Sequence, residues 1–353
     1  MFRLRWLCGG ILMLLTLTVA AQDLRTQVEQ LRTDMYRLYG TDSLQRFMDT
    51  TNKLKKVAQA AGDEKTFYRA WANQALFVFR KKNRKEGQAI LEQVRSYADE
   101  RDSKFGLYIS ISVNTTFLSL LNMNDELEKE YQKCIDYVHQ YFPEESAATD
   151  YLGLARLYYN NTQFGKVMDV AKKTLKEPNL NDTHRQIALA YICLAYSMMP
   201  EKEIDLKTFN QYYQEFKKFR EKTGRDTGMN DIVDFNYYQL NHQPLKALEA
   251  AKHMAIPLNR LLYVAEAYEK LDSFKQAYYT MRAFRKLTDS LNSAESKKQA
   301  TEHALQLNIE RAENEAKDLR IENQQLELDQ KNEEILAVAI IGVIVVGFLV
   351  HTT

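Results

Sequence analysis

The chain has 353 residues, a length that fits one large domain or two ordinary ones. Gly and Pro number only 12 and 5, and because both residues interrupt helices, their scarcity favours an all-helical fold. Lys and Arg total 48 against 47 Asp and Glu. The resulting net charge of +1 argues against nucleic acid as a partner, because phosphate binding needs a concentrated basic face.

Residues 1–21 have the pattern of a secretory signal peptide. Two arginines precede an apolar run that ends near Val19, and small residues follow it. Cleavage after Ala20 or Ala21 would start the mature chain near Gln22 and would export it. The alternative is an apolar segment that stays uncleaved as an anchor.

Residues 22–290 contain a repeat with a step of 40 residues and one final step of 30. The corresponding positions are Met35, Ala75, Thr115, Ala155, Ala195, Phe235 and Ala265. Apolar residues within each unit follow helical spacing, and polar segments such as "NMNDE", "NNTQ" and "NHQP" predict short turns. We therefore predict about seven helical hairpins, with helices of roughly 14 to 18 residues, stacked into a solenoid that buries their apolar faces.

The fourth unit departs from this pattern, because Lys207 falls where the other units place an apolar or small residue. The preceding segment "PEKEIDLK" predicts that the second helix of this unit is displaced along the chain. Its apolar face would carry Phe209, Tyr213, Phe216 and Phe219.

The repeat resembles the tetratricopeptide repeat, in which a large residue, a small residue and an aromatic residue precede an alanine in the second helix. Residues that match this pattern are Trp71, Ala75 and Val78 in one unit, Tyr151, Ala155, Tyr158 and Pro178 in another, and Leu261, Ala265, Tyr268 and Ala277 in the last. The family unit has 34 residues, whereas most steps here have 40. The resemblance therefore implies longer connections or longer helices in this chain.

Tetratricopeptide arrays resembling this one bind peptides or protein segments on a concave face, which the first helix of each hairpin lines. Carried over slot by slot, the resemblance implies the groove candidates Arg69, Arg156, Tyr159, Tyr196 and Asn236. Arginine pairs with carboxylates, and tyrosine offers a flat apolar ring with a polar tip. For the two tyrosines the alternative is packing between neighbouring helices.

Residues 291–334 predict a coiled-coil stalk, since they contain neither Gly nor Pro and repeat apolar residues by four and three. The seam consists of Leu305, Ile309, Ala312, Ala316, Leu319, Asn323 and Leu326. Asn323 falls on an a position, where a buried asparagine favours two parallel strands in register. We therefore predict a parallel homodimer, and the alternative is a single exposed helix.

Residues 335–350 are an uninterrupted apolar run that predicts a transmembrane helix continuous with the stalk. At 1.5 Å per residue the run rises about 24 Å, slightly less than the hydrocarbon core of about 30 Å. Export would place the repeats outside and residues 351–353 as a cytoplasmic stub. The expected location is therefore the inner membrane, crossed once, with the bulk of the chain in the periplasm.

The sequence contains no Gly-rich phosphate loop, no paired-cysteine motif and no metal-binding pair of histidines. It therefore predicts neither catalysis nor a cofactor or metal. Cys134 and Cys193 remain after cleavage of the signal peptide. Export would permit a disulfide between them, but two buried and unpaired thiols are the simpler expectation.

The order of signal peptide, repeats, heptad helix and apolar span resembles the sensor halves of membrane-bound bacterial signalling proteins, chiefly sensor histidine kinases of Gram-negative bacteria. The resemblance implies a periplasmic region that senses a ligand, dimerises and signals through the stalk, with the output domain absent. Its partners would be a peptide or protein segment, a second copy and the lipid bilayer. The alternative is a membrane-tethered scaffold that assembles envelope proteins without signalling output.

Overall fold

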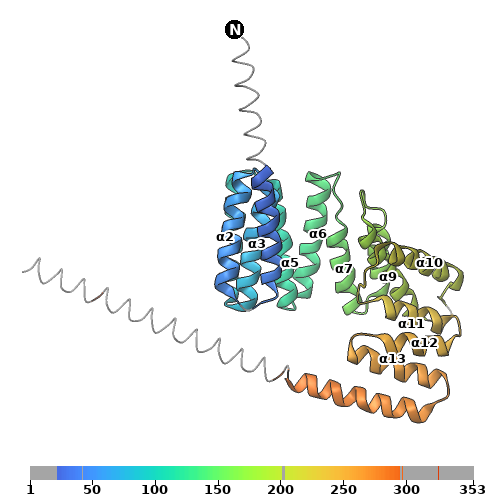
Figure 1. The fold of residues 1–353 in the computed structure, drawn as a ribbon. Coiled ribbons are helices and arrows are strands. Elements are labelled where there is room, and N and C mark those ends of the chain that lie inside the picture. The colour runs from blue at the N-terminus through green and yellow to red at the C-terminus, as the bar shows by residue number, and fades with distance from the viewer. Residues whose placement is uncertain (1–21, 42, 201–202, 295, 297–324, 326–353) are drawn as a thin grey trace, which may run out of the picture. The chain divides into compact units, whose positions relative to one another are not determined.

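The computed structural model describes residues 22–41, 43–200, 203–294, 296 and 325. All regular secondary structure within these ranges is helical (Figure 1). None of the described helices is both long enough and apolar enough to cross a membrane. The predicted signal peptide, the seven seam residues of the stalk and the apolar run 335–350 lie outside the described residues.

The helices divide into two units, one up to Ala255 and one from Ile256 onward. The first unit starts with a helix over residues 22–39. It continues with α2 (Leu44–Ala60), α3 (Glu64–Lys81), α4 (Arg84–Glu100), α5 (Lys104–Leu120), α6 (Asn124–Tyr141), α7 (Ala148–Asn160), α8 (Phe164–Thr174), α9 (Asp182–Ser197), α10 (Leu206–Thr223), α11 (Asn230–Leu240) and α12 (Pro244–His253). The second unit contains α13 (Pro257–Lys270) and a terminal helix over residues 274–294.

Consecutive helices of the first unit pair as hairpins, and each hairpin packs against the next. Helix α3, for example, contacts its hairpin partner α4 and also α2 and α5, which belong to the neighbouring hairpins. The same relation holds for α9, which contacts α10 in its own hairpin and α7, α8 and α11 outside it. The described part of the first unit is thus an all-α solenoid of helical hairpins, compatible with a tetratricopeptide-like fold.

The repeated small positions lie in the core of this solenoid. Ala75, Ala155 and Ala195 are 0 % exposed, and a small side chain at such a position lets a neighbouring helix approach closely. The larger residues at equivalent positions, Thr115 and Phe235, are buried as well. The predicted repeat positions are therefore core positions, whichever residue occupies them.

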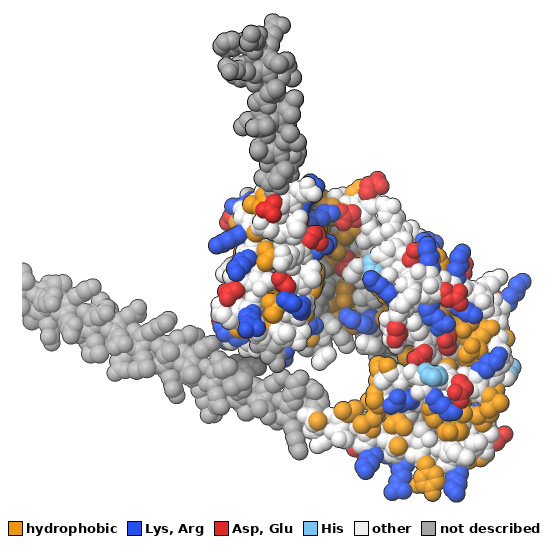
Figure 2. All heavy atoms as spheres, in the orientation of Figure 1, with side chains coloured by type: hydrophobic (Ala, Val, Ile, Leu, Met, Phe, Trp, Pro, Cys, Tyr) orange, Lys and Arg blue, Asp and Glu red, His pale blue; other side chains and the backbone are white. Residues whose placement is uncertain are grey.

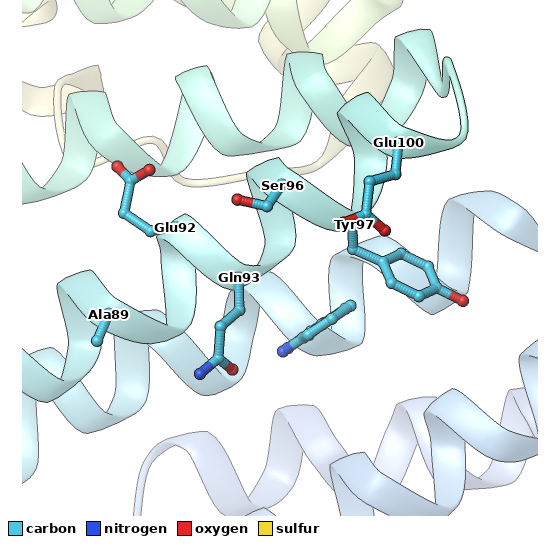
Figure 3. A pocket seen from close by; sticks show the side chains of 7 residues that line it. Ala89, Glu92, Gln93, Ser96, Tyr97 and Glu100 are labelled. Carbon is cyan, nitrogen blue, oxygen red and sulfur yellow. The ribbon is translucent and has the colours of Figure 1, made fainter.

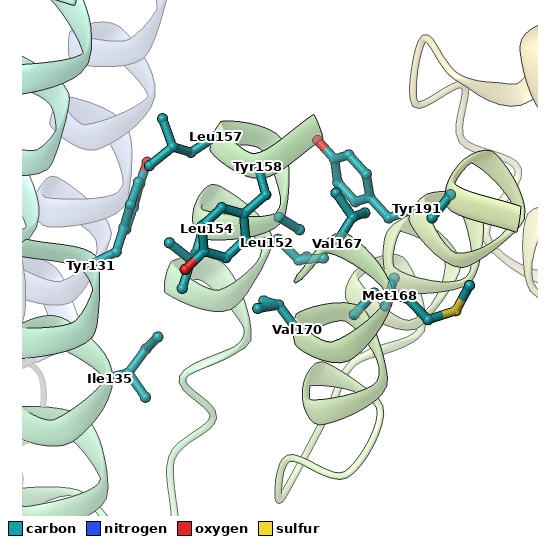
Figure 4. Packing of buried hydrophobic residues seen from close by; sticks show 14 of the residues in the cluster. Tyr131, Ile135, Leu152, Leu154, Leu157, Tyr158, Val167, Met168, Val170 and Tyr191 are labelled. Atoms are coloured by element: carbon teal, nitrogen blue, oxygen red, sulfur yellow. The ribbon is translucent and has the colours of Figure 1, made fainter. Parts of the chain in front are cut away.

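Helix α9 is enclosed on all sides, because every residue from 188 to 195 is buried. Much of this cover comes from α10, whose Phe209, Tyr213 and Phe216 form one cluster with α9. The displaced second helix that the sequence predicted for the fourth unit is thereby confirmed. A second cluster joins α6, α7, α8 and α9, and Figure 4 shows Tyr131 and Ile135 of α6 on the side of α7.

One backbone turn recurs at six helix ends. A residue with φ between 50° and 68° follows the helix, and these residues are Gly62, Asp102, Asn122, Thr162, His242 and Asp272. The amide of the next residue then donates to the carbonyl five positions earlier, at 2.8 to 3.0 Å, as from Gln163 to Tyr158. This six-to-one bond is the Schellman motif, which satisfies carbonyl groups at a helix end. It explains why the connections are so short.

Cys134 and Cys193 are both buried and unpaired. The first lies in α6 and the second in α9. The simpler expectation from the sequence, two small side chains in the core, is confirmed.

Candidate functional site

The first unit has a hollowed surface. Figure 2 shows this hollow between helices α2 to α5 and helices α9 to α12, with hydrophobic and charged side chains on its walls. Of the predicted groove residues, Arg69 stands on α3 and Arg156 on α7, and both side chains are exposed. A network of buried tyrosines and one carboxyl group lies between these two arginines.

Arg69 lies at one end of this series of contacts. Its guanidinium group lies 5.4 Å from the centre of the Phe105 ring on α5. Burial raises the pKa of the nearby Tyr108 hydroxyl, Asp150 adds to that rise, and the positive charge of Arg69 opposes it. Because Arg69 affects the pKa of Tyr108, the guanidinium charge must lie close to the polar network of Tyr108 and Asp150.

Asp150 is the centre of the network. It lies in the first turn of α7 and is 2 % exposed. The Tyr108 hydroxyl donates to Asp150 Oδ2 at 3.0 Å. Burial raises the pKa of Asp150 to about 6, and the hydrogen bond from Tyr108 limits the rise. Burial, with the added charge of Asp150, also raises the pKa of the Cys134 thiol, so tyrosine and thiol both stay protonated beside the carboxylate at neutral pH.

Tyr131 and Arg156 continue the network along α7. Tyr131 comes from α6 and lies against Gly153, where an added Cβ would be 2.5 Å from Tyr131 Cζ. Burial raises the pKa of Tyr131, and the neighbouring Arg156 opposes this rise. Arg156 acts in the same direction on Tyr191 of α9, although burial raises the pKa of Tyr191 to about 12. The guanidinium group of Arg156 therefore stands beside two buried tyrosines.

Neither arginine has an acidic partner in the part of the chain that the structure describes, since no ion pair within 4.0 Å involves Arg69 or Arg156. Arg220, by contrast, is bound to Asp234 at 2.7 Å. A guanidinium group presents several donors in one plane and suits the two oxygens of a carboxylate. The two exposed arginines can therefore bind anionic groups of a ligand without breaking an existing ion pair.

The two predicted groove tyrosines have internal aromatic contacts. The ring centre of Tyr159 lies 5.8 Å from that of Phe164, with the rings edge to face. The ring centre of Tyr196 lies 6.3 Å from that of Phe209 and 6.0 Å from that of Tyr212. Both side chains are only partly exposed, so each combines packing between helices with a limited accessible surface.

Asn236, the last predicted groove residue, is 7 % exposed, and its amide nitrogen donates to Ser197 Oγ at 2.8 Å. The amide therefore already has a partner inside the protein. The site that the structure brings together consists of Arg69 and Arg156 with Tyr108, Asp150 and Tyr131 between them, and the sequence analysis did not single out these last three. A buried acid in an apolar run, "DYLGLAR", was the available signal for Asp150.

No known protein-family model matches the chain, and no curated protein matches it either. The function is therefore argued from the geometry and charge of the site.

A separate pocket of about 530 Å³ lies on the hairpin of α3 and α4. Its lining residues are Trp71, Ala89, Glu92, Gln93, Ser96, Tyr97 and Glu100. Figure 3 shows that most of them come from one side of α4. The ring centres of Trp71 and Tyr97 are 5.2 Å apart, and Lys55 Nζ lies 4.7 Å from the Trp71 ring. The pocket thus has an aromatic base and two acidic residues at its edge.

Proposed function

We propose that the solenoid of residues 22–290 is a tetratricopeptide-like binding region that takes an acidic peptide or protein segment between Arg69 and Arg156. The observation that carries this proposal is the pair of exposed guanidinium groups, which form no ion pair with any described residue and flank a network of tyrosines. The fold supports the proposal because stacked hairpins present their first helices along one extended surface.

The charge distribution also limits which ligands fit. The carboxyl group of Asp150 lies between the two arginines, and with a pKa of about 6 it is mostly ionised at neutral pH. A negative charge in the middle of the ligand would be repelled, whereas acidic groups at its two ends would meet the arginines. We therefore expect a ligand with an apolar or aromatic centre and acidic ends.

For the whole chain, we propose the sensing and dimerising region of an exported, membrane-bound signal-transduction protein of the sensor histidine kinase type. The binding site joins α3, α5, α6 and α7, so a bound ligand can alter how these hairpins pack. The predicted stalk would carry that change towards the membrane as a shift between two helices. Such signalling requires the ligand to bind one state of the stalk more tightly than the other.

The binding site is tested with the full chain in lipid nanodiscs and two pools of labelled synthetic peptides. One pool has glutamate at both ends of an apolar centre, and the other has glutamine at the same positions. We expect the acidic pool to bind, and we expect Arg69→Ala with Arg156→Ala to weaken binding about tenfold or more, because charge-assisted pairs are lost. Equal binding of both pools would show that the arginines do not select carboxylates.

The matched control is Arg46→Ala with Arg95→Ala. These arginines are also exposed, but they stand on α2 and α4, the second helices of their hairpins. The control has the same change in net charge as the test variant. Equal losses of binding in the two double variants would indicate a general charge effect and would contradict the site.

The signalling role is tested by fusing the chain to a kinase reporter and shortening the stalk within residues 305–326. Removing seven residues preserves the heptad phase, whereas removing four changes it. We expect a ligand response in the first fusion and a lost or altered response in the second. Identical behaviour of the two fusions would refute a signal that depends on helix phase.

The pocket around Trp71 favours a second candidate function, a membrane-tethered scaffold that holds two envelope proteins at once. A scaffold needs two separate surfaces, and this pocket is distinct from the arginine site. Filling it with Ser96→Trp should release one partner in photo-cross-linking while the acidic peptides still bind. If Ser96→Trp changes no cross-link, the pocket does not bind a partner and the scaffold hypothesis is contradicted.

A further inference from the structure

The terminal helix, residues 274–294, exposes a row of large apolar side chains. Phe274 and Tyr278 are both 63 % exposed, and Met281 is 37 % exposed. Spacings of four and three residues place these side chains on one face of the helix. Five of the 13 large apolar residues exposed in the described part of the chain belong to this helix, so the row is not the ordinary scatter of single apolar residues on a surface.

An adjacent row of the same helix is already packed. Ala277, Phe284 and Thr288 are partly buried, and the turn at Asp272 joins the helix to α13 as a hairpin (Figure 1). Packing inside the chain therefore uses one side of the apolar stripe and leaves the flank at Phe274 and Met281 uncovered.

The uncovered flank is in phase with the predicted stalk seam. Phe274 and Met281 precede Ile309 by 35 and 28 residues, which are five and four whole heptads. Leu291, which is 48 % exposed, precedes Leu305 by 14 residues, or two heptads. In the predicted stalk register Phe274 and Met281 therefore occupy a positions and Tyr278 the flanking e position. The d positions Ala277 and Phe284 belong to the packed row, so the exposed face is the a and e side of the stripe.

The residues beside the row are compatible with a second copy of the same helix. In this register Thr280 and Leu287 occupy g positions, and Arg285 and Asn292 occupy the e positions that they would face in a parallel partner. No like charges meet across this contact. Glu295, Lys298 and Glu302 fill the next three core positions, so the stripe consists of two apolar segments separated by a charged interval.

We propose that the terminal helix docks on the terminal helix of a second copy through Phe274, Tyr278 and Met281, about a two-fold axis parallel to the stalk. The contact is isologous, since the same row serves both copies. It extends the dimer interface back into the last hairpin of the solenoid, so that movement of this hairpin is coupled directly to the stalk. The proposal rests on the parallel dimer of the proposed function.

The test is disulfide cross-linking of the full chain in lipid nanodiscs, with Cys8 replaced by serine because it lies outside the described residues. Met281→Cys places a thiol in the proposed interface, and the buried native thiols Cys134 and Cys193 do not compete. Arg282→Cys is the matched control, because this residue is also exposed but is rotated by about 100° around the helix. We expect Met281→Cys to cross-link about tenfold faster than Arg282→Cys, because a disulfide forms only between closely approaching Cβ atoms.

Ile309→Cys in the predicted seam separates the failure of this proposal from the failure of the dimer. Cross-linking at residue 309 with no difference between residues 281 and 282 would leave the dimer standing and would overturn the contact. No cross-link at either interface position would refute both.

A second measurement uses Phe274→Asp with Tyr278→Asp and follows the dissociation constant of the dimer by sedimentation. We expect an increase of about 30-fold, the effect of losing a central apolar contact. An unchanged constant would assign the row to another partner and overturn the proposal.

Discussion

Replacing Gly87 by alanine should destabilise the hairpin of α3 and α4, although alanine is the better helix former. Gly87 is the fourth residue of α4, and an added Cβ would lie 2.5 Å from Phe79 Cβ and 2.7 Å from the Phe79 Cα and backbone nitrogen. The obstacle is backbone, so the helices must separate by about 1 Å to reach ordinary contact. Phe79 also stacks on Phe117 of α5 at 4.0 Å, which passes the displacement to the next hairpin.

The magnitude follows from two opposed terms. Overpacking a core costs about 1–3 kcal/mol, and alanine recovers about 1 kcal/mol of helix propensity relative to glycine. The difference is a net loss of up to about 2 kcal/mol for Gly87→Ala. With a denaturant slope of about 1–3 kcal/mol per molar, each 1 kcal/mol that is lost lowers the urea midpoint by roughly 0.3–1 M.

The assay is urea unfolding of the mature chain, followed by circular dichroism and by tryptophan fluorescence. The chain has two tryptophans, and Trp6 would leave with the signal peptide, so Trp71 of α3 reports on this hairpin. Gly165→Ala in α8 is the control, since an added Cβ there meets nothing within 4 Å, and it should raise the midpoint. A midpoint for Gly87→Ala at or above that of the wild type would refute the reasoning.

Three further predictions follow from groups described above. Burial raises the pKa of Asp150 to about 6 from an ordinary 3.8. Between pH 3.8 and about pH 6, Asp150 is therefore protonated in the folded protein and ionised in the unfolded chain. Stability should therefore fall by about 3 kcal/mol as pH rises from 4 to above 6, and Asp150→Asn should flatten this profile in urea titrations at several pH values. Cys134 and Cys193 are buried, and burial raises the pKa of both thiols, so a maleimide should label them only as fast as the protein unfolds. Thr162 is β-branched and has φ of 57°, so Thr162→Gly should raise the free energy of unfolding by about 1 kcal/mol, and an unchanged urea midpoint would contradict that strain.

The sequence predicted the helical hairpins because helical periodicity and short polar turns are local signals. The segments around Asn122 and Thr162 do lie between paired helices, yet their polarity gave no sign that both residues adopt a left-handed conformation. Helices were predicted at roughly 14 to 18 residues, whereas α7, α8, α11 and α12 have 13, 11, 11 and 10. Prolines follow α8 and α12 at positions 178 and 257 and limit how far these two helices extend.

The candidate site was predictable only in part. Arg69 and Arg156 could be placed on first helices because a repeat fixes which positions face outward. The hydrogen bond from Tyr108 to Asp150 joins residues 42 positions apart. Such a pairing depends on how neighbouring hairpins are rotated against each other, and a local sequence pattern does not reveal that rotation. The same holds for Gly153, whose missing side chain becomes meaningful only when Tyr131 is known to lie against it.

The complete enclosure of α9 has a consequence for cooperativity. In a linear array each repeat contacts only its neighbours, and such arrays can melt from either end, one repeat at a time. Helix α9 contacts α7, α8, α10 and α11 and has no exposed side along residues 188–195. Melting on either side of α9 therefore leaves its apolar surface in water, at a cost proportional to the area uncovered. The hairpins before and after α9 should thus unfold together in one cooperative step. Gradual fraying is then confined to the ends of the array.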